Sequence, residues 1–163
     1  LDISLKPTTL RSARATGFIK LPPAALARVV EGSVQKGDVR EAARLAGLMA
    51  VKRTPDLLPH CHPIGVLRAE VTATVQSDGI ALEAEVETVS ATGVEMEALT
   101  AVSVAALTLY DMCKSYDREM RISEIIGSTS ASLNRFFSPP DSGGEHVANL
   151  REAIGDQKVS EEG

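Results

Sequence analysis

The fold of this chain is decided by residues 66–88, VLRAEVTATVQSDGIALEAEVET. Apolar residues take alternate positions on both sides of Ser77-Asp78-Gly79: Val71, Ala73 and Val75 before it, and Ile80, Leu82, Ala84 and Val86 after it. Because successive side chains of a strand point to opposite faces, this alternation predicts two strands with one core face and one solvated, acidic face. The Ser-Asp-Gly turn signal between them predicts a β-hairpin.

Outward from this hairpin, the sequence predicts the remaining elements. Periodicity, prolines and capping residues indicate a strand at 12–21, helices at 24–31 and 39–53, a long helix at about 93–116 and a last strand at 121–126. Pro55 is expected to close the second helix, and residues 92–95 fit a capping box for the long one. This order predicts an α+β fold, a ferredoxin-like split βαβ sandwich whose antiparallel sheet is packed by helices on one face.

The composition is that of a single globular domain followed by a polar end. Of 163 residues, 44% are hydrophobic and 24% are charged. We expect one domain over residues 1–127 and a polar tail over 128–163, flexible or partly helical, because Ser, Pro, Gly and charge are concentrated there. The net charge of −5 argues against general nucleic-acid affinity. No uninterrupted apolar run approaches the roughly 20 residues of a membrane span.

The two cysteines indicate the compartment. Cys61 and Cys113 lie in different predicted elements, and no signal peptide is recognisable before them. We therefore expect reduced thiols and a cytoplasmic location.

The second helix carries candidate cations at both ends. A lysine beside glycine at a helix N-terminus, as in Lys36-Gly37-Asp38, can bind phosphate because free N–H groups and the helix dipole add to its charge. A turn followed by an N-cap at Asp38 explains the same tripeptide. Lys52 and Arg53 complement the dipole at the other end of the helix, and they lead into a histidine loop with which they could share a pocket.

That loop, His60-Cys61-His62, is held extended by Pro59 and Pro63. Side chains two residues apart on an extended backbone face the same way, so the two histidines can converge on a ligand. Anion binding or acid/base work is the favoured interpretation. A zinc-dependent hydrolase using the histidines and a cysteine stays open as an alternative, although structural zinc usually takes four N or S ligands in spaced pairs.

The long helix is apolar almost all the way round, yet it is charged at both ends. The helix dipole would explain Glu95 and Glu97 in its first turn, and an exposed i, i+3 ion pair would explain Asp111 and Lys114. Charges in such an apolar setting otherwise indicate a partner or a function. Glu97 and Asp111 are separated by about 21 Å at about 1.5 Å per residue. One small ligand does not easily reach both ends, so the spacing suggests two sites or a site shared between two copies of the chain.

Several motifs together carry a resemblance to a known family. They are Lys-Gly-Asp-Val at 36–39, Ala-Val-Lys-Arg-Thr at 50–54, Asp-Leu-Leu-Pro-His-Cys-His-Pro at 56–63, Thr-Gly-Val-Glu-Met-Glu-Ala-Leu-Thr-Ala at 92–101 and Ala-Ala-Leu-Thr-Leu-Tyr-Asp-Met-Cys-Lys at 105–114. With these motifs, and over about residues 1–126, the chain resembles the cyclic pyranopterin monophosphate synthase family of molybdenum cofactor biosynthesis, known as MoaC.

The resemblance implies a lyase. It would convert 3′,8-cyclo-7,8-dihydro-GTP into cyclic pyranopterin monophosphate and release pyrophosphate. It implies a ferredoxin-like fold assembled as a homohexamer from dimers, with sites between subunits. It implies no metal or redox cofactor, and no nucleic-acid or membrane partner.

The resemblance also implies roles for particular residues. Asp111 matches the catalytic acid/base, with Lys114 beside it, and Lys36 would bind phosphate or transfer protons. The expected substrate contacts are His60, Cys61, His62, Glu95, Met96 and Glu97, together with the pocket cations Lys52 and Arg11.

One stretch departs from the family pattern. A Gly-rich loop with lysines is usual after the last strand, whereas this chain has Gly127-Ser-Thr-Ser-Ala-Ser-Leu-Asn-Arg-Phe-Phe. Arg135 could replace the charge but does not readily exchange a proton. The alternative function is therefore a divergent, non-catalytic oligomer that binds a phosphorylated pterin or nucleotide.

Overall fold

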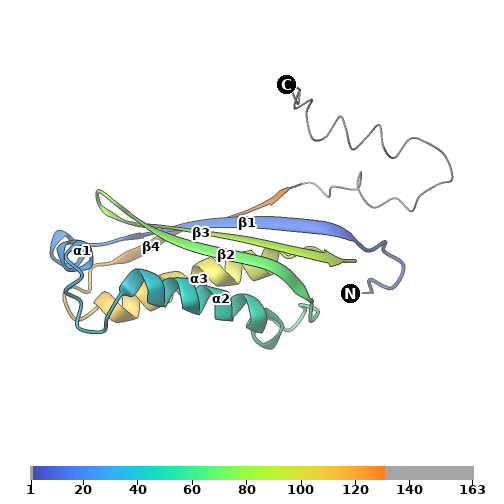
Figure 1. The fold of residues 1–163 in the computed structure, drawn as a ribbon, viewed down its shortest axis with the longest axis horizontal. Helices are drawn as coiled ribbons and strands as arrows, with labels where there is room; N and C mark the ends of the chain where they lie inside the picture. Colours follow the sequence, from blue (N-terminus) through green and yellow to red (C-terminus); the bar gives the residue numbers. More distant parts are fainter. Residues whose placement is uncertain (1, 131–163) are drawn as a thin grey trace, which may run out of the picture. The chain divides into compact units, whose positions relative to one another are not determined.

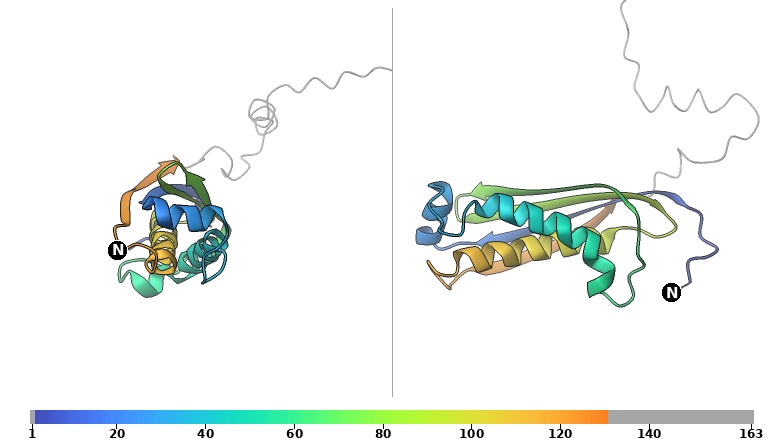
Figure 2. Two further views of the ribbon diagram at one scale, coloured as in Figure 1. Left: turned by 90° about the vertical axis from the view of Figure 1, so that its left-hand side faces the viewer. Right: turned by 60° about the horizontal axis from the view of Figure 1, so that its bottom comes forward.

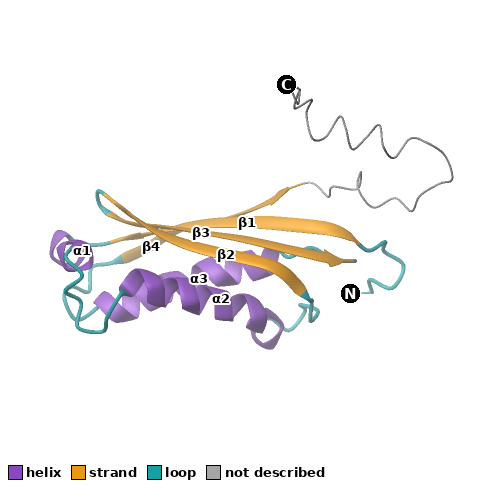
Figure 3. Ribbon diagram, in the orientation of Figure 1, coloured by secondary structure: helices purple, strands orange, loops and turns teal. Residues whose placement is uncertain are grey.

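The computed structural model describes residues 2–130, with the side chains described to Ser128. Residue 1 and residues 131–163 lie outside this range, so most of the predicted tail does too. The elements, shown in Figures 1 and 3, are β1 (Thr9–Lys20), α1 (Pro23–Val30), α2 (Val39–Leu57), β2 (Val66–Gln76), β3 (Gly79–Ser90), α3 (Glu95–Cys113) and β4 (Arg121–Ser130).

The four strands form one open antiparallel sheet in the order β2-β3-β1-β4. Since β1 and β2 both pair antiparallel with β3, they run parallel to each other with β3 inserted between them. α2 and α3 pack on one face of this sheet, and the end-on view of Figure 2 shows sheet and helices as two layers. The predicted α+β class is confirmed, with the antiparallel sheet packed by helices on one face.

The hairpin forms as its alternation predicts. Gln76 pairs with Gly79 across a two-residue turn. Every second residue of β3 is buried: Ile80, Leu82, Ala84 and Val86. Gly79 lies so close to the backbone of Ile19 in β1 that a β-carbon there would clash. The turn glycine is therefore required by the neighbouring strand as well as by the turn.

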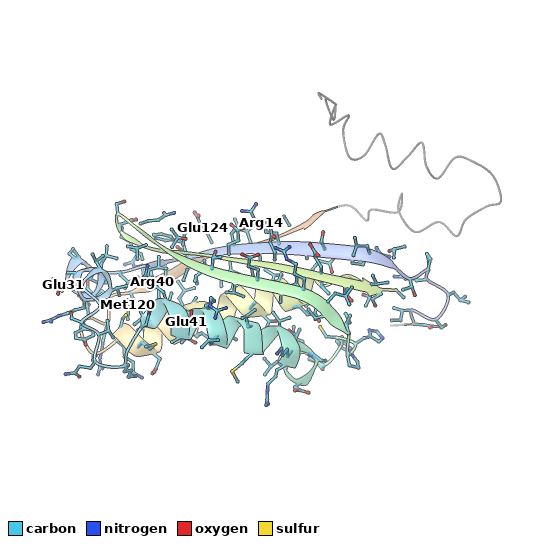
Figure 4. All side chains as sticks on the ribbon, viewed as in Figure 1. Arg14, Glu31, Arg40, Glu41, Met120 and Glu124 are labelled. Atoms are coloured by element: carbon cyan, nitrogen blue, oxygen red, sulfur yellow. The ribbon has the colours of Figure 1, made fainter. Side chains whose placement is uncertain are left out.

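The outer face of the sheet is polar and charged. Arg14 of β1 pairs with Glu83 of β3, and Arg68 of β2 lies within 4 Å of three glutamates. Figure 4 shows Arg14 and Glu124 on the side of the sheet away from α2 and α3. Glu124 has a φ of 54°, close to the point where the register between β1 and β4 shifts.

α3 is the central helix of the core. Its inward side consists of small and branched residues with almost no exposure: Ala98, Ala101, Val102, Ala105, Ala106 and Leu109. By length and composition α3 could cross a membrane, but half of its apolar window is buried within the domain. That is the property of a core helix packed on α2 and the sheet, and length and composition alone are weak evidence for a span.

Three sequence predictions about element ends are wrong. α2 continues through Pro55 to Leu57, because the Leu58 amide still donates to the Thr54 carbonyl and proline removes only its own amide bond. α3 begins at Glu95 after an N-cap at Val94 with no side-chain cap bond, so the capping box does not form. β4 runs to Ser130 because residues 128–130 pair with β1, which shortens the predicted tail by three residues.

Two leucines on α3 give a test of this packing. Leu109 is 0% exposed and Leu107 is 59% exposed. We expect Leu109→Ala to lower the free energy of unfolding by about 2–5 kcal/mol, because it leaves a cavity, and Leu107→Ala to change it by less than about 0.5 kcal/mol. Urea unfolding at one fixed protein concentration measures both. Equal losses would contradict the orientation of the helix.

Candidate active site

Lys36, Asp111 and Lys114 form one cluster at the C-terminal end of α3. The Lys36 Nζ donates to Oδ2 of Asp111 at 2.7 Å and to its carbonyl oxygen at 2.9 Å. The Lys114 Nζ lies 2.7 Å from the other carboxylate oxygen, Oδ1. The helix spacing predicts the pair of Asp111 and Lys114. The fold adds Lys36 to this pair, although Lys36 is 75 residues away from Asp111 in the sequence.

The charges of this cluster set the state of its carboxyl group. Hydrogen bonds and charge from Lys114 first, and from Lys36 second, lower the pKa of Asp111 to about 2. At neutral pH the carboxylate is therefore ionised, and it can accept a proton but has none to donate. The three side chains remain 47–55% exposed, so a ligand can reach them.

A second group of predicted residues lines a cavity of about 180 Å³ at the other end of α3. The histidine loop, the start of α3 and the N-terminal segment meet there. The lining comprises Asp2, Ile3, Lys6, His60, Cys61, His62, Ile64, Thr92, Gly93, Glu95, Met96 and Glu97. Six of the eight predicted substrate contacts are thus brought together.

Glu97 is the unusual member of this cavity. It is 3% exposed, and no ion pair involves it within the described part of the chain. Burial, reinforced by the charge of Glu95, raises the pKa of its carboxyl. Burial and the nearby Glu97 also raise the pKa of the Cys61 thiol. A buried acid with a raised pKa that lines a cavity is a frequent property of functional sites.

Glu95 has a different position from the one the capping-box prediction gives it. Its carboxylate folds back against Gly93, where a β-carbon would collide with it. The glycine therefore makes room for an acid at the cavity wall.

The two predicted pocket cations do not line this cavity within one chain. Lys52 is exposed on α2. Arg11 lies on β1 opposite Thr88 of β3, and its Nε is buried without a hydrogen-bond partner. A buried donor without an acceptor is costly, which is consistent with a group that is completed by a ligand or another chain.

Sequence reasoning missed Lys6 and the neighbouring Asp2 and Ile3. These residues precede β1 and carry no motif, and the prediction began the strand only at residue 12. They reach the cavity because β1 starts beside the end of β3, with Thr9 opposite Ser90. Only the register of the sheet reveals this proximity.

The described residues offer no ready metal site. Within residues 2–130, no three His, Cys, Asp or Glu side chains are arranged to hold a metal ion. The histidine loop therefore lacks the further ligands that the zinc alternative requires.

The fold and these two clusters define a class of protein, a small α+β domain in which two exposed lysines around a carboxylate can bind a phosphorylated ligand. Comparison with known proteins identifies the family. The model of the MoaC family matches residues 1–128. The chain belongs to the MoaC family, as the motifs predicted.

Named relatives cover most of the domain. The chain is 53% identical over 127 residues to cyclic pyranopterin monophosphate synthase 1 of Mycobacterium bovis, and the aligned residues cover 77% of this chain and 75% of the relative. It is 53% identical over 127 residues to cyclic pyranopterin monophosphate synthase of Roseiflexus sp., with 77% of this chain and 80% of the relative aligned. The same name applies to a relative from Parvibaculum lavamentivorans that is 50% identical over 127 residues, covering 77% and 79%.

The state of Asp111 gives a test of the cluster. We expect its carboxyl to titrate near pH 2 in the unmodified protein and at higher pH in each of the single variants Lys36→Met and Lys114→Met. The upward shift of the pKa should be larger in Lys114→Met, because Lys114 contributes more to the lowered pKa. Carbon-13 NMR of the side-chain carboxyl during a pH titration measures this. Lys20→Met removes a lysine paired with Asp78 instead, and should leave Asp111 unchanged. A normal pKa in the unmodified protein would mean that the cluster does not exist in solution.

Proposed function

We propose that this chain is a cyclic pyranopterin monophosphate synthase, acting at an early step of molybdenum cofactor biosynthesis. It would convert 3′,8-cyclo-7,8-dihydro-GTP into cyclic pyranopterin monophosphate and release pyrophosphate. The observation that carries the proposal is the contact of both Lys36 and Lys114 with Asp111, since the family resemblance marks all three residues as catalytic. Identity of 53% to relatives of that name supports it.

The cluster suits chemistry on a phosphorylated substrate. Lys36 and Lys114 are compact cations that bind phosphate oxygens and carry protons for transfer. Asp111 is ionised, holds both ammonium groups and can accept a proton. These are the parts needed to close a cyclic phosphate while pyrophosphate departs.

The cavity at the opposite end of α3 suits the ring system of the proposed cyclised nucleotide substrate. His60 and His62 provide donors and acceptors for a heterocycle, and Glu97 provides a buried carboxyl. Its volume of about 180 Å³ is smaller than the roughly 300–1,000 Å³ of typical ligand pockets. Within one chain this half of the site is incomplete.

We propose that two copies of the chain complete each site. One copy would contribute the Lys36 cluster and its neighbour the histidine cavity, because about 21 Å of helix separates the two within a chain. Exposed apolar side chains on the helix layer support association: Leu45 and Met49 on α2. The family resemblance favours a homohexamer built from dimers, and the two unpaired cysteines Cys61 and Cys113 favour the cytoplasm.

A direct test is turnover of enzymatically prepared 3′,8-cyclo-7,8-dihydro-GTP, following both products. We expect the unmodified protein to form both, and Asp111→Asn to keep its oligomeric state while kcat falls by at least about 100-fold, because the amide neither accepts the proton nor holds the lysines. Asp78→Asn, at an exposed aspartate that also pairs with a lysine, should leave turnover unchanged. Near-normal rates for Asp111→Asn would contradict the assigned role.

Mixed oligomers test whether the site is shared. Asp111→Asn and His62→Asn chains, each inactive alone, are co-expressed with different tags, and oligomers carrying both tags are purified. If each site combines the Lys36 cluster of one copy with the histidine cavity of another, each of these two parts is unmutated in half of the copies. Random assembly then leaves about a quarter of the sites with both parts intact. We therefore expect about a quarter of the unmodified activity. Mixed oligomers as inactive as the separate variants would place both halves in one chain.

The non-catalytic alternative has one observation in its favour. In residues 115–130, which include all of β4, the chain has no lysine. Gly127 and Ser128, from the stretch that departs from the family pattern, lie in β4 paired with Ala15 and Arg14 of β1. Binding of the cyclised nucleotide without formation of either product would favour this alternative.

A further inference from the structure

Lys36 lies in a loop that few contacts hold in place. In residues 31–38, between α1 and α2, Val34 is the one buried side chain, at 6% exposure. The Gly37 amide donates to the Val34 carbonyl at 3.0 Å, and Gly37 has a φ of 99°, a conformation that favours glycine. The loop therefore turns sharply just after the lysine, with little burial to fix it.

Besides the Lys36 side chain and the buried Val34, a backbone hydrogen bond to Tyr116 ties this loop to the rest of the domain. The backbone amide of Gln35, next to Lys36, donates to the Tyr116 hydroxyl oxygen at 2.9 Å. Tyr116 is itself fixed to the end of α3, because its amide donates to the Cys113 carbonyl at 2.9 Å. Its half-buried ring packs against the core.

Arg28 of α1 supports the same arrangement. Its guanidinium carbon lies 5.9 Å from the centre of the Tyr116 ring, within reach of a cation–π interaction. Its Nη1 donates to the Ser33 hydroxyl at 3.5 Å, at the beginning of the loop. The tyrosine ring and the loop are thus both linked to one side chain of α1.

We propose that Tyr116 is a positioning residue that sets Lys36 against Asp111 by holding the Gln35 amide. Its importance for turnover rests on the proposed function of the Lys36 cluster. The end of α3 supplies the carboxylate that binds the lysine ammonium, and Tyr116, just after α3, supplies the hydroxyl that anchors the backbone of the preceding residue, Gln35. The end of α3 and the turn that follows it, rather than the loop alone, therefore determine the distance between the two charged groups, and small displacements of such groups are costly for catalysis.

No sequence motif points to Tyr116. The motif that ends at Lys114 stops two residues earlier, and Gln35 is 81 residues away in the sequence. The role follows from the hydrogen bond in the folded chain.

Tyr116→Phe is the decisive variant, because it keeps the ring and removes only the hydroxyl acceptor. The matched control is Tyr110→Phe, whose hydroxyl donates to the Arg118 carbonyl at 3.4 Å and does not touch the loop. In Tyr116→Phe, we expect the Asp111 carboxyl, followed by carbon-13 NMR, to titrate at higher pH, since Lys36 is held less often beside it. We expect kcat/KM to fall by about three- to tenfold, as for loss of one hydrogen bond. Tyr110→Phe should change neither.

Two outcomes would overturn the proposal. One is an Asp111 titration in Tyr116→Phe identical to that of the unmodified protein. The other is a further shift when Tyr116→Phe is added to Lys36→Met, because Tyr116 would then act on Asp111 without Lys36. Both measurements are independent of turnover. Absence of turnover in the unmodified protein would count against the proposed function, while the titration would still decide whether Tyr116 positions Lys36.

Discussion

The structure depends on the close packing of α3 against both the sheet and α2. This packing needs small residues at the contacts. Gly17 of β1 lies beneath Val102, where a β-carbon would collide, and Gly47 of α2 lies against Val71 and the Ala101 carbonyl. Dense packing of this kind leaves a helix little freedom to shift or tilt. α3 is therefore a rigid support whose two ends carry the two groups of candidate site residues at a fixed separation.

The two ends provide opposite electrostatic environments. At the C-terminal end the helix dipole favours cations, and Lys114 and Lys36 surround an ionised carboxylate that is exposed to solvent. At the N-terminal end the dipole favours anions, yet burial outweighs it and raises the pKa of Glu97. One helix thus has an exposed cluster of two lysines and a carboxylate at one end and a cavity with a buried acid at the other.

Local patterns predicted much of the fold, and long-range contacts explain what they missed. The hairpin and α3 were predictable because alternation and continuous apolar character are properties of adjacent residues. The pairing of Asp111 with Lys114 follows from helix spacing, but that with Lys36 joins segments that only the tertiary fold brings together. The same reason hides the place of Lys6 in the cavity and the bond between Gln35 and Tyr116. The end of β4 was missed because its polar residues are held by backbone pairing to β1, which needs no apolar pattern.

The Lys36 cluster also links binding to reactivity. Asp111 is a weak base in the free protein because two ammonium groups stabilise its ionised form. A phosphate anion competes for the same ammonium groups, since both lysines are half-exposed and offer several donors each. Each lysine that turns toward phosphate removes part of the interaction that lowers the pKa of Asp111. If a phosphorylated substrate binds these lysines, as proposed, the carboxylate becomes a stronger base on binding, while its lysines keep it a weak base in the empty site.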